Sequence, residues 1–427
     1  MTTLTRVARR EAARGTQRSV VATSAYNVVS TAAAGLAGIV IARSLGPSTR
    51  GEYAAIMAWF GLLVVVGGLG QSAATTFFVA RDPARARDYV AVSRIIMLAS
   101  GALTLVGGLA AAPLFASGHS DAVAWGYRIM FATCLAAFVG STYQCALQGS
   151  SIPRWNLARI SQPIAYLVVI FALHAAGQLT LIAAMVAFAA TMVAQTVLSH
   201  WLCAQGGLTG GRAGSAPTRP LVRYGVGQLA ATIPVVMMAR LDQLTLSLVV
   251  APAVLGNYAV AASLTTLAVP VAAGLGYVAF PRIAAQRGPE SPTDRTQWRI
   301  VAVSAWVALA VMLPVAALAP WVVPLVFGAG FDDAVVLVAI LAPGGVFLAC
   351  QQVCADLLRG HGRPFAIARS QGAAAGLMVV LLAVLLPVIG PMGAAIASST
   401  STGVSVLLLL RALRRALPRT ETKGALA

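Results

Sequence analysis

The chain alternates between long apolar runs and short polar segments. Most runs are close to 20 residues long, and a helix of about 20 residues spans the ~30 Å hydrocarbon core of a bilayer. The pattern predicts an all-α polytopic membrane protein with about twelve transmembrane helices. A further apolar segment, 320–330, is interrupted by Pro and Gly and is expected to dip into the outer interface. The expected helices are 20–41, 53–79, 89–114, 123–147, 157–174, 179–203, 221–250, 256–280, 299–318, 334–358, 365–386 and 392–413.

A Gly-rich basic linker divides the expected helices into two sets of six. It covers residues 205–220. We therefore expect an N-terminal bundle over 20–204 and a C-terminal bundle over 221–413. Basic tails at 1–19 and 414–427 flank the two bundles.

The positions of the basic residues predict the orientation. If the N-terminus is cytoplasmic and the helices alternate, only Arg43, Arg50, Arg128 and Arg240 of the 30 Lys and Arg residues fall outside the cytoplasmic segments. Basic residues accumulate in cytoplasmic loops. The sequence thus predicts a multi-pass protein of the bacterial inner membrane with both termini cytoplasmic. The net charge of +18 then reflects topology, and no nucleic-acid partner is expected.

The two sets of helices share a short motif. Pro47, Gly51 and Tyr53 open the second helix in the pattern P-x-x-x-G-x-Y-A, and the same pattern recurs where the eighth helix begins, at 252–259. Six helices separate the two copies, and an even number preserves orientation. We therefore expect two parallel six-helix repeats around a central cavity, an arrangement suited to alternating access.

The composition and motifs argue against several other classes of protein. Only 10% of the residues are charged, whereas a soluble domain has roughly 25%. The chain has no phosphate-binding loop of the G-x-x-x-x-G-K-[ST] type and no H-E-x-x-H zinc motif. The expected outer loops are short, which disfavours a membrane enzyme such as a polysaccharide polymerase. We expect no catalytic residue, no metal site and no cofactor.

Two charged residues lie in the middle of the expected seventh helix. Ionisable groups at membrane depth cost a few kcal/mol and usually face a cavity. Arg240 is a candidate for contacting an anionic group, and Asp242 for coupling to a proton or sodium ion. Residues at i and i+2 do not share a helix face. The alternative is that they form a structural ion pair with each other or with another helix.

Other polar residues are weaker candidates for substrate contacts. Asn27, Gln71 and Gln228 lie inside apolar runs, where such residues also serve as hydrogen-bonding links between helices. Arg128 would either contact a phosphate or sit at the membrane interface beside Trp125. Asp356 is one turn from Arg359, and we expect these two residues to pair.

Four segments carry a resemblance to a known family. They are A-R-S-L-G-P-S-T-R-G-E-Y-A at 42–54, C-A-L-Q-G-S-S-I-P-R-W-N-L-A-R at 145–159, R-L-D-Q at 240–243 and L-G-N-Y-A-V-A-A at 255–262. With them the chain resembles the bacterial oligosaccharide and polysaccharide flippases of the multidrug/oligosaccharidyl-lipid/polysaccharide exporter superfamily. Some relatives have fourteen helices, and the last two have no counterpart here.

The resemblance implies a fold, a cargo and a set of cavity residues. The fold is two six-helix bundles whose first, second, seventh and eighth helices line the cavity. The cargo is an undecaprenyl-diphosphate-linked oligosaccharide, moved from the inner to the outer leaflet for cell-surface polysaccharide assembly. The expected partners are this lipid-linked oligosaccharide, membrane lipids and a coupling proton or sodium ion. The alternatives are a cation-coupled multidrug exporter of the same fold and a flippase for the peptidoglycan lipid precursor.

Overall fold

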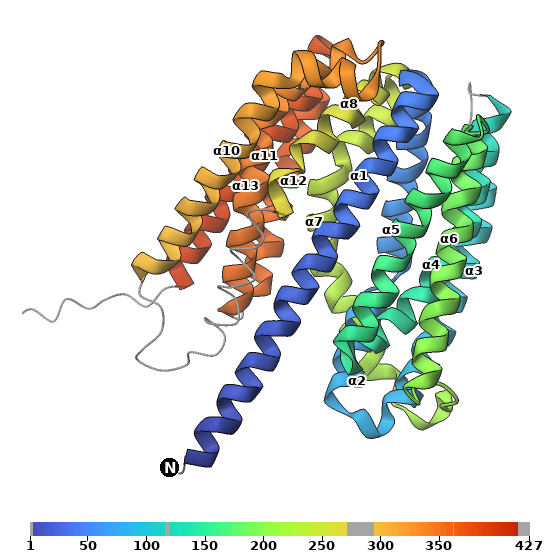
Figure 1. The fold of residues 1–427 in the computed structure, drawn as a ribbon, viewed down its shortest axis with the longest axis vertical. Coiled ribbons are helices and arrows are strands. Elements are labelled where there is room, and N and C mark those ends of the chain that lie inside the picture. The colour runs from blue at the N-terminus through green and yellow to red at the C-terminus, as the bar shows by residue number, and fades with distance from the viewer. Residues whose placement is uncertain (1–2, 116–119, 271–293, 362, 417–427) are drawn as a thin grey trace, which may run out of the picture.

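The computed structural model describes residues 3–115, 120–270, 294–361 and 363–416, and helices are the regular structure found in these residues (Figure 1). Two short 3-10 turns, Pro83–Arg85 and Ala213–Ser215, lie in connections. The α-helices are α1 (Thr3–Gly67), α2 (Gln71–Arg81), α3 (Ala86–Phe115), α4 (Asp121–Ser150), α5 (Ile152–Ala175), α6 (Leu181–Gln205), α7 (Thr218–Val249), α8 (Pro252–Thr265), α10 (Asp294–Phe327), α11 (Asp332–Gly360), α12 (Pro364–Ile389) and α13 (Pro391–Ala416).

Eleven helices in the described residues are long and apolar enough to cross a membrane. The first of them, α1, is bent at Gly46, where φ is 73° and ψ is 175°. Figure 1 shows the chain rising through α1 and turning back at the upper end. The apolar part of α1 is 46 residues long, which is enough for two crossings of about 20 residues. The prediction of an all-α membrane protein with about twelve spans is confirmed.

The single helix expected over 53–79 is wrong, because the chain breaks between α1 and α2. Leu69 and Gly70 adopt positive φ values of 49° and 64°, a region that favours glycine. The break also brings two backbones together. A Cβ added to Gly70 would lie 2.1 Å from the carbonyl oxygen of Gly225 on α7. A side chain at residue 70 would therefore separate α2 from α7.

The helix expected over 299–318 is longer in the structure, and the dip of 320–330 into the interface stays a prediction. Helix α10 continues through Pro320 and Pro324 to Phe327. A proline inside a helix costs about 3 kcal/mol, but Val323 and Phe327 are buried in the core on this part of the helix. We attribute the continuous helix to that packing. The expected helix at 256–280 begins as α8, and its part from residue 271 onward lies outside the described residues.

The two halves share an apolar core at one end of the molecule, which we call the apical end. This end holds the Gly46 bend of α1 and the start of α8, at the top of Figure 1. One apolar core there combines Ala42 and Ala54 of α1 with Tyr258 of α8 and Val323 of α10. Figure 1 shows α10 spreading away from the helices of the first half toward the opposite, basal end, where α1 begins. Helix α7 of the second half remains in contact with α2 of the first half there.

The repeated motif forms the apical contact. A Cβ added to Gly51 would lie 1.7 Å from the carbonyl oxygen of Pro252, and one added to Gly256 would lie 2.0 Å from that of Pro47. Each half thus places its glycine against the proline of the other half. We call these four residues the apical junction. It is reciprocal, as expected for two parallel repeats that pack face to face.

Candidate functional site

A cavity of about 840 Å³ lies at the basal end between the two halves. Helix α2 belongs to the first half, whereas α7 and α12 belong to the second. The end of α2 and the starts of α7 and α12 border the cavity, so the partial positive charges of two helix N-termini lie beside it. We call it the basal chamber. Its lining consists of Phe77, Phe78, Arg81, Arg219, Pro220, Arg223, Tyr224, Gly227, Gln228, Ala231, Pro364 and Phe365.

Aromatic rings hold α2 against α7 at this chamber. The rings of Phe77 and Tyr224 are stacked, with centroids 4.7 Å apart and planes inclined by 14°. Phe78 meets the same tyrosine edge-on at 6.0 Å and stacks on Tyr89 of α3 at 5.1 Å. Such pairs contribute about 0.5–1.5 kcal/mol each beyond area burial. The chamber wall is therefore an ordered aromatic surface that bridges the two halves.

Three arginines supply the charge of the chamber. Arg81, Arg219 and Arg223 are exposed to solvent. The guanidinium carbon of Arg81 lies 5.6 Å from the centre of the Phe77 ring. Among the described residues, no carboxylate forms an ion pair with any of the three. The arginine fork binds phosphate in a bidentate manner. The chamber thus offers three guanidinium groups to a bound anion.

The expected residue Gln228 lines this chamber, and Gln71 is buried next to it. Gln71 is 1% exposed, and neither its side-chain oxygen nor its nitrogen has a hydrogen-bond partner. The side-chain amide nitrogen of Gln71 lies close to the backbone of Gly225 on α7. A Cβ added to Gly225 would be 2.5 Å from this nitrogen. Burial of an unsatisfied amide costs about 1–3 kcal/mol. Gln71 is therefore held at the contact between the halves at an energetic cost.

Arg240 and Asp242 lie on different faces of α7. Arg240 is exposed, and its Nη1 donates to Gln243 Oε1 at 3.4 Å. Asp242 is buried, and its Oδ2 accepts hydrogen bonds from Tyr258 Oη of α8 at 2.6 Å and from Ser398 Oγ of α13 at 3.1 Å. The structural alternative of a mutual ion pair is not observed between these two described residues.

The remaining expected residues lie away from the basal chamber. Asn27 is half-buried on α1. Arg128 is half-buried on α4, with its guanidinium carbon 5.0 Å from the centre of the Trp125 ring. Neither residue is part of the chamber lining.

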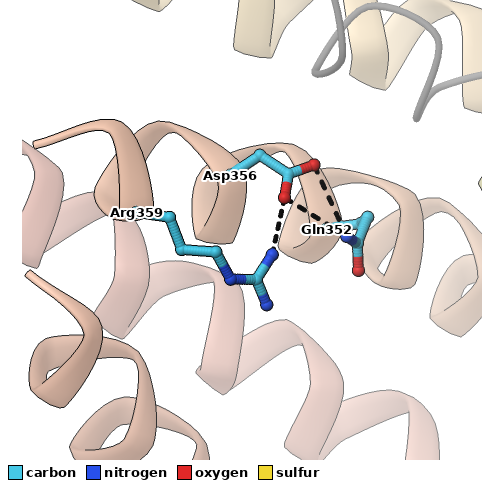
Figure 2. Close-up of polar contacts among 3 residues, drawn as sticks. All are labelled: Gln352, Asp356 and Arg359. Carbon is cyan, nitrogen blue, oxygen red and sulfur yellow. Dashed lines mark hydrogen bonds and ion pairs between the residues drawn. The ribbon is translucent and has the colours of Figure 1, made fainter. Parts of the chain in front are cut away.

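Figure 2 shows the expected pairing of Asp356 on α11. Arg359 Nη1 donates to Asp356 Oδ1 at 2.6 Å, and Gln352 Nε2 lies 3.4 Å from each carboxylate oxygen. All three side chains come from successive turns of one helix face. The predicted pair is confirmed, and it neutralises a carboxylate that the helix buries.

Sequence reasoning missed the arginines and aromatic residues of the basal chamber. Arg81, Arg219 and Arg223 served only as evidence for orientation, because loop arginines usually report topology. A usable signal was present. Arg81 follows Phe77 by four residues and Arg223 immediately precedes Tyr224, so each half places an arginine next to an aromatic ring at the same end of the molecule.

The fold is similar to those of several solved transporters. An inward-facing multidrug resistance transporter of the MATE family in the MOP superfamily aligns with a TM-score of 0.73 and 15% identity, covering 92% of this chain and 96% of that chain. Lipid II flippase MurJ, in an inward closed conformation, aligns with a TM-score of 0.73 and 14% identity, covering 92% and 87%. At these identities the likeness concerns the fold alone.

The family is shown by the sequence itself. No curated protein matches this chain significantly. Residues 17–287, which are more than half of the chain, match the family described as polysaccharide biosynthesis protein. This match and the fold agree with the resemblance seen in the sequence motifs. The chain therefore belongs to the polysaccharide biosynthesis protein family, and it is a multi-pass membrane protein with the fold of the transporters it resembles.

Proposed function

We propose that this protein moves an undecaprenyl-diphosphate-linked oligosaccharide from the cytoplasmic to the outer leaflet of the bacterial inner membrane, for assembly of a cell-surface polysaccharide. The observation that carries the proposal is the basal chamber between the two halves, with three arginines on an aromatic wall that form no ion pair within the described residues. In this proposal the basal end faces the cytoplasm, as the distribution of arginines predicts. The chamber would then be open on the side where such substrates are made.

The chemistry of the chamber matches the polar part of this substrate. A diphosphate cannot cross hydrocarbon unaided, because a desolvated charge costs many kcal/mol. Arginines hold phosphate oxygens by charge-assisted hydrogen bonds. The aromatic rings offer flat apolar surfaces to the sugar rings. The polyprenyl tail would remain in the bilayer and extend from the gap between the two bundles.

We propose that one face of α7 lines the substrate path from the chamber toward the apical end. Arg219, Val226, Ile233 and Arg240 recur at seven-residue intervals, and all four are exposed. Residues at this spacing lie on nearly the same side of a helix. An arginine facing lipid at this depth would be unfavourable. We therefore assign Arg240 to the wet path, as a second anion contact beyond the chamber.

The charge of the chamber distinguishes this function from the alternatives. Three arginines attract an anionic headgroup and repel a lipophilic cation, which disfavours a multidrug exporter of cationic compounds. A peptidoglycan lipid precursor also carries a diphosphate, so the chamber alone does not separate it from a polysaccharide precursor. The match to the polysaccharide biosynthesis family favours the polysaccharide precursor.

Depletion of the protein in its host tests the proposed cargo. We expect undecaprenyl-diphosphate-linked oligosaccharides of the polysaccharide pathway to accumulate in the cells, as measured by mass spectrometry of extracted lipids. Accumulation of the peptidoglycan precursor alone would support that alternative. Unchanged lipid-linked glycans together with reduced dye efflux would contradict the proposal and favour a drug exporter.

Asp242 is our candidate for the group that couples transport to a proton or sodium ion. A buried carboxylate at membrane depth is costly and is commonly functional. Tyr258 and Ser398 come from two other helices of the same half. A change in the charge on Asp242 would therefore alter the packing of α7 against α8 and α13.

Replacing Asp242 by Asn should uncouple transport without preventing insertion. Asparagine has nearly the same shape as aspartate and still accepts a hydrogen bond from Tyr258. Its side chain is neutral, so it can neither release a proton nor attract a sodium ion by a negative charge. We expect transport driven by an imposed proton or sodium gradient to fall by about tenfold or more, because removal of a charged partner is typically worth at least ~1.4 kcal/mol. Gradient-driven transport in proteoliposomes measures this effect.

The matched control is Asp332→Asn, the same exchange at an exposed apical position. It should leave gradient-driven transport unchanged. If the Asp242→Asn variant fails to insert, it will be inactive with and without a gradient. Tyr258→Phe then provides the second test, because it removes one hydrogen bond to Asp242 and keeps the carboxylate. Normal coupling in both variants would exclude Asp242 as the coupling group.

A further inference from the structure

A second arginine-lined cavity lies at the basal end, separate from the basal chamber. It occupies about 440 Å³ between α12 and α13 and shares no lining residue with the chamber. We call it the α12–α13 pocket. Its charged lining consists of Arg363, Arg369, Arg411 and Arg415, and the remaining lining is Ala366, Ser370, Ala373, Leu408 and Ala412.

The fold concentrates these four charges in one place. Helices α12 and α13 are joined only by Gly390 at the opposite end and pack against each other. The start of α12 therefore meets the end of α13. Arg411 and Arg415 are one turn apart on one face of α13, and Arg363 and Arg369 face them across the pocket. All four are exposed, and within the described chain no carboxylate forms an ion pair with them.

Helix electrostatics explains only one of these four arginines. Arginine near the C-terminus of a helix is favourable, which accounts for Arg415 at the end of α13. Arg363 is the N-cap of α12, where a positive charge opposes the helix dipole. Arg369 and Arg411 lie outside the terminal turns of their helices and gain nothing from the dipoles. Four arginines around one cavity also repel each other. An anion bound among them would relieve both effects.

The shape of the pocket favours a lipid anion over a free one. Ala366, Ala373 and Leu408 provide apolar wall between and below the arginines. Arginine pockets between transmembrane helices at a cytoplasmic face bind anionic lipid headgroups. A phosphate attached to acyl chains would use both the charged rim and the apolar wall, whereas an inorganic anion would use the rim alone.

We propose that the α12–α13 pocket binds the phosphate headgroup of an anionic phospholipid from the leaflet at the basal end. This role is separate from the transported cargo and does not depend on the proposed function. The pocket adjoins the basal chamber, because Arg363 lines it while the next two residues, Pro364 and Phe365, line the chamber. A bound phospholipid thus braces the start of α12 from the side opposite the chamber.

Lipid binding to the purified full-length protein tests this site. Dioctanoyl-phosphatidylglycerol is the anionic probe, dioctanoyl-phosphatidylcholine the neutral one and inorganic phosphate the free anion, with binding measured by native mass spectrometry and by thermal stabilisation. The wild type should bind the anionic lipid and be stabilised by it. The double variant Arg369→Ala/Arg411→Ala should bind the anionic lipid at least about tenfold more weakly than the wild type, because two charge-assisted contacts are lost.

The matched control is Arg85→Ala/Arg87→Ala, which removes two exposed basal arginines outside both cavities and should bind as the wild type does. If the alanine variant is unstable without lipid, Arg369→Gln/Arg411→Gln keeps the side-chain bulk and gives the same expected loss. Equal weakening in the control, or full binding by the pocket variants, would overturn the proposal. Binding of inorganic phosphate as tight as that of the lipid would overturn it in favour of a free-anion site.

Discussion

Replacing Arg219 and Arg223 together by alanine should reduce transport of the diphosphate-linked glycan on the order of a hundredfold. Both arginines line the basal chamber and have no carboxylate partner among the described residues. Each charge-assisted hydrogen bond to a phosphate is worth about 1.5–3 kcal/mol, and 1.4 kcal/mol corresponds to a factor of ten. The measurement is the rate at which a lipid-linked glycan reaches the outer leaflet of proteoliposomes.

The control for this change is Arg85→Ala/Arg87→Ala, which removes the same charge at the same end of the molecule but outside the chamber. It should retain wild-type transport. A similar loss in both variants would mean that overall basal charge, and not the chamber, governs activity. Full transport by Arg219→Ala/Arg223→Ala would remove these two residues from the substrate path.

Replacing Gly51 by alanine should open the apical junction and reduce transport by about tenfold or more. The new Cβ would lie 1.7 Å from the carbonyl oxygen of Pro252, so the two halves must separate there. Overpacking of this kind costs about 1–3 kcal/mol, which is enough to shift a balanced two-state equilibrium strongly toward the open state. A protein that cannot close its apical end cannot complete the transport cycle.

A cysteine reporter measures the opening directly. Ala259 is 5% exposed and belongs to the apolar core beside the junction. In a background without native cysteines, Ala259→Cys should resist a membrane-impermeant maleimide in the otherwise unchanged protein and react with it in the Gly51→Ala variant. Gly256→Ala should behave in the same way, because its new Cβ meets Pro47 from the other side.

Gly61→Ala is the matched control, since it lies on the same arm of α1 and an added Cβ there meets no atom within 4 Å. It should leave both labelling and transport unchanged. Protection of the Ala259→Cys reporter in the Gly51→Ala variant, together with normal transport, would show that the junction is not the apical seal.

Hydropathy and charge were sufficient to predict the architecture. Membrane helices can be recognised in a sequence by their length and apolar composition, because every backbone polar group in lipid must form its hydrogen bond within the helix. The repeated motif at 47–54 and 252–259 correctly indicated a duplicated fold. In such a fold the two equivalent turns come together, as they do at the apical junction.

The breaks in the helices were harder to predict from local sequence. The chain breaks before Gln71, and α7 approaches the backbone there at Gly70. Pro320 and Pro324 did not end α10, because its apical turns are buried. In both cases tertiary contacts decided the outcome. Local propensity gives no information about such contacts.

The candidate site was the least predictable part. Arg240 and Asp242 were correctly expected on different faces of one helix, but the partners of Asp242 lie 16 and 156 residues away in sequence. The chamber arginines were indistinguishable from ordinary loop charges until α2, α7 and α12 were placed together. A composite site of this kind is visible only once the helices are assembled.

Reconstitution with a defined substrate tests the central claim most directly. The purified protein is placed in proteoliposomes with a fluorescent undecaprenyl-diphosphate oligosaccharide, and exposure of the sugar on the opposite leaflet is followed by a membrane-impermeant glycosidase or lectin. The account predicts protein-dependent exposure that is lost in Arg219→Ala/Arg223→Ala and retained in Arg85→Ala/Arg87→Ala. Exposure at the protein-free rate, or a rate indifferent to both double substitutions, would contradict it.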